Sequence, residues 1–165
     1  MKKQILVVLS LLVLGACAKK QEPIVITADD FHRSVDKVGE IMVHDIFSPP
    51  VASRVFAYPS IAAYEIIAQE NSKYRSLENQ LTGFSDITES PADQPINFQL
   101  AALLAHLDLN KRLIFSEERI EFYRDRLYEV WENQHAEEFK ASKTYGLQVA
   151  AHIYWWMDQD NYKQT

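Results

Sequence analysis

Histidine and acidic side chains at helical spacing offer the clearest opportunity for chemistry in this chain, which has five histidines. Glu132 and His135 are three residues apart, the spacing that places two ligands on one helical face in di-iron bundles. Such a centre needs a second pair of this kind and two further glutamates. None of the other histidines has a glutamate three positions before it. We therefore interpret Glu132 and His135 as a solvated helix end, with metal binding as a weaker alternative.

Three other patterns of reactive residues also stop short of a site. His44 and Asp45 resemble part of a metal-phosphohydrolase dyad, but an isolated dipeptide is weak evidence. Asp158 and Asp160 begin like a calcium-binding loop, yet Lys163 stands where that loop requires glycine. The four glycines form no phosphate-cradling loop. The sequence therefore predicts no catalytic residue, no metal ligand and no bound cofactor in this chain.

The single cysteine, Cys17, follows a short hydrophobic leader. Lys2 and Lys3 precede an apolar run over 5–14, and a glycine and an alanine stand directly before the cysteine. The run has the length of a signal-peptide core, whereas a membrane-spanning helix needs about 20 residues. The arrangement resembles the lipobox of bacterial lipoproteins, in which the cysteine becomes the acylated N-terminus. We expect residues 1–16 to be removed and Cys17 to carry the lipid. The alternatives are an ordinary secretory signal with an incidental cysteine, or a buried N-terminal helix.

The remainder divides into a tether over 17–28 and one helical domain over 29–165. The formal net charge is -6 and becomes more negative once Lys2 and Lys3 are removed. An acidic domain without a basic stripe argues against a nucleic-acid partner. We expect the protein to be lipid-anchored in the bacterial cell envelope. Ala18 after the cysteine favours the outer membrane, because some lipoproteins retained in the inner membrane carry aspartate there.

Apolar residues recur every three or four positions along most of the mature chain, which predicts an all-α bundle of about five helices. Asp29 or Asp30 is expected to cap the first helix, and Ser116 is expected to cap another. A helix that starts at 48–50 is expected to kink or restart at Pro59. The expected apolar face of the first helix consists of Phe31, Val35, Val38, Met42 and Ile46. The stretch 97–115 is the most apolar and should be central, the last helix should span 136–157, and 71–95 should form a connection.

Two regions resemble vanadium-dependent haloperoxidase-like lipoproteins of the type 2 phosphatidic acid phosphatase superfamily. The similar stretches are HDIFSPPVASR at 44–54, AYP at 57–59, IAAYE at 61–65 and WWMDQDNYKQT at 155–165. The last of them is similar to the segment that leads into the catalytic half of the family. The similarity spans most of 30–165. The resemblance implies an N-terminal helical region of a longer enzyme.

The resemblance also implies where the chemistry of such an enzyme would be. The family holds vanadate or phosphate with three boxes, Lys-x6-Arg-Pro, Pro-Ser-Gly-His and Ser-Arg-x5-His. Their cations neutralise the oxyanion, and a histidine holds or attacks it. All three boxes are missing here; Arg54, for example, is followed after five residues by Ser60 where the third box needs histidine. The sequence therefore assigns vanadate or phosphate only to a full-length family member.

Two functions fit these observations. In the first, the chain is an inactive scaffold around a missing C-terminal catalytic half. This hypothesis predicts an exposed apolar face at Tyr154, Trp155 and the second side of 97–115. In the second, it is a self-sufficient envelope lipoprotein that binds a protein or small ligand, and its large aromatic residues should be buried. The burial of Trp155 and Trp156 distinguishes the two.

Overall fold

Five α-helices account for most of residues 21–160, which the computed structural model describes, and no strand occurs among them. The helices in chain order are α2 (Ala28–His44), α3 (Pro49–Glu70), α4 (Phe98–Leu113), α5 (Glu117–Gln134) and α6 (Ala136–Met157), followed by the short 3-10 helix η1 (Asp158–Asp160). The predicted all-α bundle of about five helices is therefore confirmed. The predicted leader and Cys17, the predicted lipidation site, lie outside the described residues. Within 21–160, no helix combines the length and the apolar character that crossing a bilayer requires.

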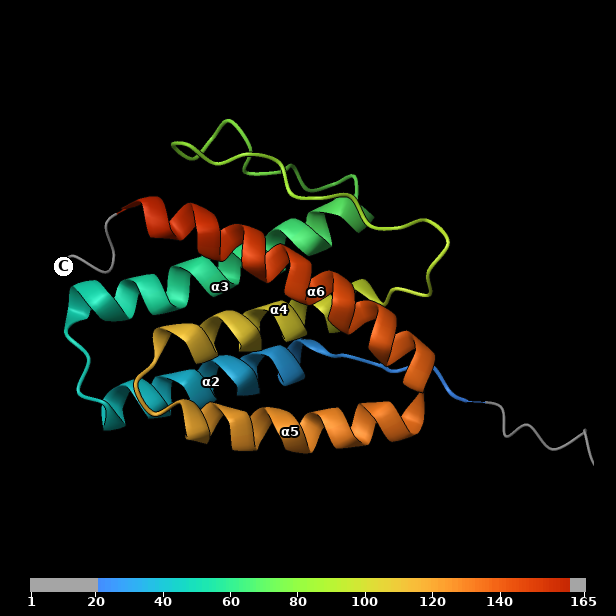
Figure 1. Cartoon of the computed structure of the whole chain (residues 1–165), viewed down its shortest axis with the longest axis horizontal. Helices are drawn as coiled ribbons and strands as arrows, with labels where there is room; N and C mark the ends of the chain where they lie inside the picture. Colours follow the sequence, from blue (N-terminus) through green and yellow to red (C-terminus); the bar gives the residue numbers. More distant parts are fainter. Residues whose placement is uncertain (1–20, 161–165) are drawn as a thin grey trace, which may run out of the picture.

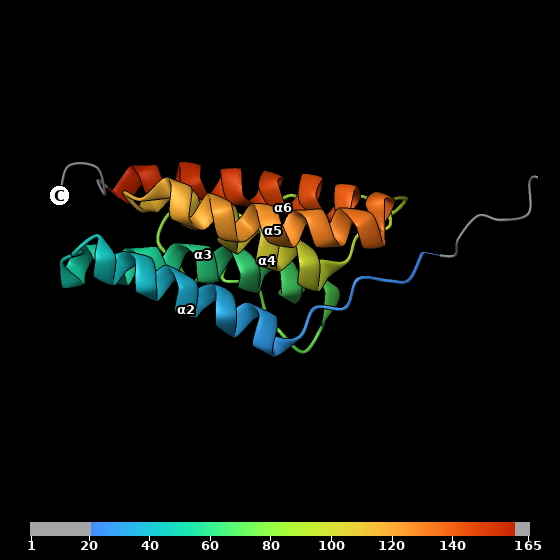
Figure 2. The ribbon, with the colours of Figure 1, turned by 90° about the horizontal axis from the view of Figure 1, so that it is seen from below.

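α4 lies at the centre of the bundle and packs against each of the other four helices. Figure 2 shows α5 and α6 on one side of the molecule and α2 and α3 on the other, with α4 between them. In Figure 1, α3 and α6 lie along the same side of α4, where they also contact each other. This arrangement confirms that the apolar stretch within 97–115 is the central helix.

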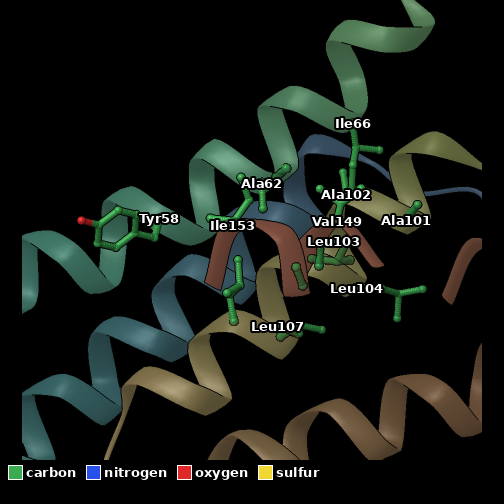
Figure 3. Packing of buried hydrophobic residues seen from close by; sticks show 14 of the residues in the cluster. Tyr58, Ala62, Ile66, Ala101, Ala102, Leu103, Leu104, Leu107, Val149 and Ile153 are labelled. Carbon is green, nitrogen blue, oxygen red and sulfur yellow. The ribbon is translucent and has the colours of Figure 1, made fainter. Parts of the chain in front are cut away.

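α4 consists largely of leucine and alanine, and it has buried side chains on all of its faces. Figure 3 shows Leu103 and Ala102 of α4 in one apolar cluster with Ile66 of α3 and Val149 of α6. Burying one leucine stabilises the fold by about 1.5–3 kcal/mol, so this helix contributes much of the driving force for folding. The expectation of an exposed second side on 97–115 is wrong, because α2 and α5 cover what α3 and α6 leave open.

A glycine lets α4 and α6 approach each other closely. A Cβ atom placed on Gly146 of α6 would lie 2.5 Å from the carbonyl oxygen of Ala101 in α4. Real Cβ atoms essentially never come that near to backbone oxygen. The two helices can therefore pack at this distance only while residue 146 lacks a side chain.

Thr27, and not Asp29 or Asp30, caps α2. The Thr27 hydroxyl accepts a hydrogen bond from the backbone N–H of Asp30, while the Asp30 carboxylate accepts from the backbone N–H of Thr27 at 2.8 Å. This reciprocal capping box satisfies two N–H groups that the helix itself cannot pair. The sequence expectation was displaced by two or three residues, because threonine is also a common N-cap residue.

The other end of α2 also differs from the expectation. The helix ends at His44, and Ile46 follows in the left-handed region with φ of 54°. Val38 and Met42 are buried as the apolar spacing predicts, whereas Ile46 is 88% exposed. The placement of Ile46 on the core face was therefore wrong, because the chain leaves the helical path before it.

The expected helix restart at Pro59 and the expected side-chain cap at Ser116 are both absent from the described structure. Pro59 lies inside α3, which runs from Pro49 to Glu70 without a restart. Ser116 precedes α5 but makes no capping hydrogen bond with its side chain. Its hydroxyl instead donates to the Asp45 carboxylate at 2.5 Å, which links the start of α5 to the end of α2.

The long connection between α3 and α4 is fixed to the bundle by a buried carboxylate. Glu65 of α3 is 1% exposed, and its two oxygens accept hydrogen bonds from the backbone N–H of Leu77 at 2.7 Å and from the Ser76 hydroxyl at 2.8 Å. Phe84 and Ile87 from the same connection are buried in the core. Figure 1 shows the connection running along the outside of α3 and α6.

Candidate functional site

A polar cluster joins the first half of α3 to the end of the described chain. The Tyr58 hydroxyl donates to the Asp160 carboxylate, and Nε of Arg54 lies 3.5 Å from an oxygen of the same carboxylate. Burial, together with the hydrogen bond to Asp160, raises the pKa of Tyr58 to about 12. In Figure 3 the Tyr58 hydroxyl points away from the labelled apolar residues of the core. The cluster brings together 44–59 and 155–160, which are two of the stretches that carry the family resemblance.

The C-terminal aromatic residues divide between the core and the surface. Trp156 is half-buried, donates from Nε1 to the carbonyl of Thr82 at 3.1 Å, and packs edge-on against Tyr58 with ring centroids 5.5 Å apart. Trp155 is 62% exposed. Tyr154 is half-buried beneath the guanidinium of Arg112, 5.3 Å from its ring centroid. The exposure of Trp155 agrees with the scaffold hypothesis, whereas the rings of Tyr154 and Trp156 are partly covered.

Asp45 fixes two loops to each other and does not form part of a catalytic dyad. Its carboxylate accepts hydrogen bonds from the backbone N–H groups of Phe115 and Ser116 at 3.1 and 3.0 Å, besides the Ser116 hydroxyl. Desolvation acts to raise the pKa of this carboxyl, but the hydrogen bonds from Ser116 and Phe115 outweigh it and lower the pKa below the usual value. His44 is exposed beside it.

Within residues 21–160, Glu132 and His135 are not joined by a third potential ligand. Glu132 is exposed, and Nδ1 of His135 accepts a hydrogen bond from the backbone N–H of Glu138 at 3.4 Å, so that His135 caps α6. Across residues 21–160, no group of three or more histidine, cysteine, aspartate or glutamate side chains is placed to hold a metal ion. The geometry of this part of the chain therefore gives the metal-binding hypothesis no support.

A buried histidine that the sequence reasoning did not single out lies between α2 and α4. His106 is 1% exposed, with Nδ1 3.0 Å from the Ser34 hydroxyl and Nε2 3.2 Å from the amide nitrogen of Asn110. The Phe31 ring covers it at a centroid distance of 4.8 Å. Burial lowers the pKa of His106 to about 4. A histidine in the middle of an otherwise apolar helix was the signal that could have identified it.

The chemistry of the His106 cluster is structural. The amide nitrogen of Asn110 also donates to the backbone carbonyl of His106 at 2.8 Å, so it acts as the donor toward Nε2. Neutral histidine has one donor and one acceptor nitrogen, and the proton therefore belongs on Nδ1, which donates to Ser34. Both ring nitrogens are occupied, and the ring is shielded from solvent. His106 therefore has no free nitrogen with which to hold or attack a substrate.

Two depressions mark the surface around α3. An apolar groove of about 430 Å³ lies between the start of α2, α3 and α4, and Phe31, Tyr64 and Ile67 are among its walls. A polar depression of about 370 Å³ lies between α3 and the following connection. Its ionisable lining consists of Glu65, Asp86 and Glu89. The groove suits an aliphatic or aromatic group, and the acidic depression disfavours anions.

No family model matches the chain, and no curated protein matches it. Among solved structures, the crystal structure of a bacterial vanadium-dependent iodoperoxidase is similar to it, with a TM-score of 0.86 and 57% sequence identity. The match covers 88% of this chain and 35% of the iodoperoxidase chain, so the chain spans about a third of the length of that enzyme. The fold of this chain is therefore that of a vanadium haloperoxidase-like helical scaffold, as the sequence resemblance predicted.

Proposed function

We propose that this chain is a membrane-anchored lipoprotein whose helices form the supporting scaffold of a vanadium-dependent haloperoxidase or acid-phosphatase type of enzyme, and that it is inactive alone. The observation that carries the proposal is the 57% identity to a vanadium-dependent iodoperoxidase over 88% of the chain. The absence of all three oxyanion-binding boxes from the sequence supports the proposal that the chain is inactive alone. The role of the chain is to present a rigid helical surface to a catalytic part that supplies those boxes.

The side chains that the structure describes do not fit vanadate or phosphate. A tetrahedral oxyanion needs converging cations and a histidine with a free nitrogen. His106 is enclosed with both nitrogens occupied, and Arg54 lies against Asp160. The polar depression beside α3 is lined by the carboxylates of Glu65, Asp86 and Glu89, which repel an anion. We therefore assign no step of oxyanion chemistry to residues 21–160.

Vanadate binding and halide oxidation test the proposal directly. The soluble chain beginning at residue 18 is mixed with vanadate, hydrogen peroxide and iodide, and the formation of triiodide is followed by absorbance. We expect no more oxidation than vanadate alone produces, and no binding heat when vanadate is titrated into the chain. The full-length bacterial iodoperoxidase serves as the positive control. Turnover by this chain, or vanadate binding at micromolar concentration, contradicts the scaffold role.

The apolar groove favours a second candidate function, in which a self-sufficient envelope lipoprotein binds a small apolar ligand. A cavity of about 430 Å³ lies within the size range of small-molecule sites, and its walls are mainly apolar. Phe31 and Tyr64 place aromatic rings on opposite helices of the groove. Binding of an environment-sensitive apolar dye distinguishes this function. A ligand-binding lipoprotein should bind the dye saturably, and Ala63→Trp should fill the groove and abolish that binding. A scaffold should show no saturable binding.

A further inference from the structure

Ile46 combines two features that are each unfavourable in an isolated domain. Its φ of 54° places a β-branched residue in the left-handed region, which is otherwise occupied mainly by glycine and asparagine. It is also 88% exposed, so its side chain recovers almost no stabilisation from burial within this chain. The position just after a helix is one where glycine would be favoured. Strained backbone of this kind clusters at sites of function and interaction, which makes Ile46 a candidate contact for a partner.

Ile46 belongs to a larger apolar surface at one end of the bundle, which we call the apolar tip and define as Val43, Ile46 and Phe115. Val43 is 81% and Phe115 is 74% exposed. The Val43 carbonyl accepts a hydrogen bond from the backbone N–H of Ile46, and the Phe115 ring stacks on Phe47 at a centroid distance of 4.7 Å. Figures 1 and 2 both show the α2–α3 connection and the α4–α5 turn at the same end of the molecule.

The apolar tip is held in a fixed shape before anything covers it. The Asp45 carboxylate lies directly before Ile46 in the chain and accepts hydrogen bonds from the backbone of Phe115 and Ser116. It thereby holds the two loops that carry the exposed side chains at a constant separation. A surface whose members are already ordered loses less conformational entropy on binding than a mobile one.

We propose that the apolar tip is the surface on which the catalytic part of a haloperoxidase-type chain docks, an inference that rests on the proposed scaffold function. The iodoperoxidase that shares this fold has about two thirds of its chain outside the match, which supplies a partner of the required kind. Three side chains of this size expose roughly 400 Å², about half of the ~800 Å² per partner that a stable interface between separate proteins buries. A contact of that size suits a partner in the same polypeptide, because the covalent connection removes most of the entropic cost of association.

A chimeric enzyme tests the docking surface. The matched third of the bacterial iodoperoxidase is replaced by residues 21–160 of this chain, and Ile46→Gly is introduced both into the chimera and into the soluble chain beginning at residue 18. In the soluble chain the substitution relieves left-handed strain, so we expect Tm to rise by about 2–4 °C. In the chimera it removes a buried anchor, so we expect Tm to fall and the amides around 43–47 to lose protection from hydrogen exchange.

Phe122→Ala is the matched control, because Phe122 is an exposed aromatic residue of α5 outside the apolar tip. We expect it to change Tm by less than the Ile46 substitution and in the same direction in both proteins. A chimera that does not fold or oxidise iodide overturns the scaffold function itself. An active chimera in which Ile46→Gly raises Tm as it does in the soluble chain overturns the docking surface alone. Dimerisation of the soluble chain that Ile46→Gly abolishes also overturns it, because the occupant is then a second copy.

Discussion

The Ser34 hydroxyl lies 3.0 Å from Nδ1 of His106, and this contact joins α2 to the buried interior of α4. Ser34 and His106 are two of the few polar residues that are buried in the described part of the chain. The histidine can remain there only while it is neutral, because a charged imidazolium away from water is costly and both of its nitrogens would then have to donate. The packing of α2 on the core is therefore linked to the protonation state of one residue.

We expect His106 to make the stability of the domain depend on pH between about 4 and 6.5. Burial lowers its pKa from 6.5 to about 4 in the folded chain, so the unfolded chain binds the proton more readily across this range. The contribution is fully present above pH 6.5 and is lost as pH falls toward 4, by up to about 3 kcal/mol. Urea unfolding at intervals from pH 4.5 to 7.5 measures it. His106→Gln should be less stable at pH 7 and should show a smaller pH dependence, whereas His32→Gln, at an exposed position, should leave the dependence unchanged.

We expect Gly146→Ala and Gly39→Ala to have opposite effects. At position 146 the new methyl group meets the Ala101 carbonyl oxygen at 2.5 Å, so α4 and α6 must separate, which lowers the free energy of unfolding by about 1–3 kcal/mol. At position 39 of α2 nothing lies within 4 Å of the new Cβ. Alanine there should stabilise the helix by about 0.5–1 kcal/mol. Chemical denaturation measures the free energy of unfolding of both variants. Equal effects would show that α4 and α6 are far enough apart to accept a methyl group at position 146.

We expect Asp45→Asn to loosen the end of the bundle that carries the apolar tip. The amide oxygen can accept only part of what the carboxylate accepts from Ser116 and Phe115, so the free energy of unfolding should fall by about 1–2 kcal/mol. Since the folded-state pKa of Asp45 is lowered, its contribution is present above the unfolded pKa and is lost as pH falls through the folded value. The variant should therefore differ from wild type at pH 7 and converge with it in acid. Asp36→Asn, at an exposed position of α2, is the control.

The helices could be predicted from the sequence because their apolar residues repeat at helical spacing. α6 was expected over 136–157 and occupies Ala136–Met157, and the central place of α4 followed from its lack of a polar face. The ends of α2 were less predictable, since Thr27, Asp29 and Asp30 are all competent caps and only the tertiary path selects one. Ile46 was misplaced for the same reason, because periodicity cannot show where a helix leaves its path.

The polar interactions could not be predicted because their partners are distant in the chain. Asp45 and Ser116 meet across two loops, and His106 meets Ser34 across a helix interface, so no local pattern signals either pair. The sequence showed the residues of the Asp160 cluster only as members of two separate stretches that resemble the family, and it did not show that they are in contact. The structure adds that these stretches are neighbours in space, with Arg54 facing Asp160.

We expect Cys17 to decide where the protein resides. If its thiol is acylated, the chain should remain in the membrane fraction after washing with high salt and be released by detergent, because several acyl chains give an anchor that salt does not disturb. Cys17→Ser should remove lipid labelling and leave the precursor uncleaved at residue 16, whereas Ser10→Ala within the apolar run should change neither. The intact mass of the endogenous protein, extracted from membranes, then separates the two functions. A species much heavier than 17–165 with its lipid supports a scaffold built into a longer enzyme, and a species of that mass supports a self-sufficient binding lipoprotein.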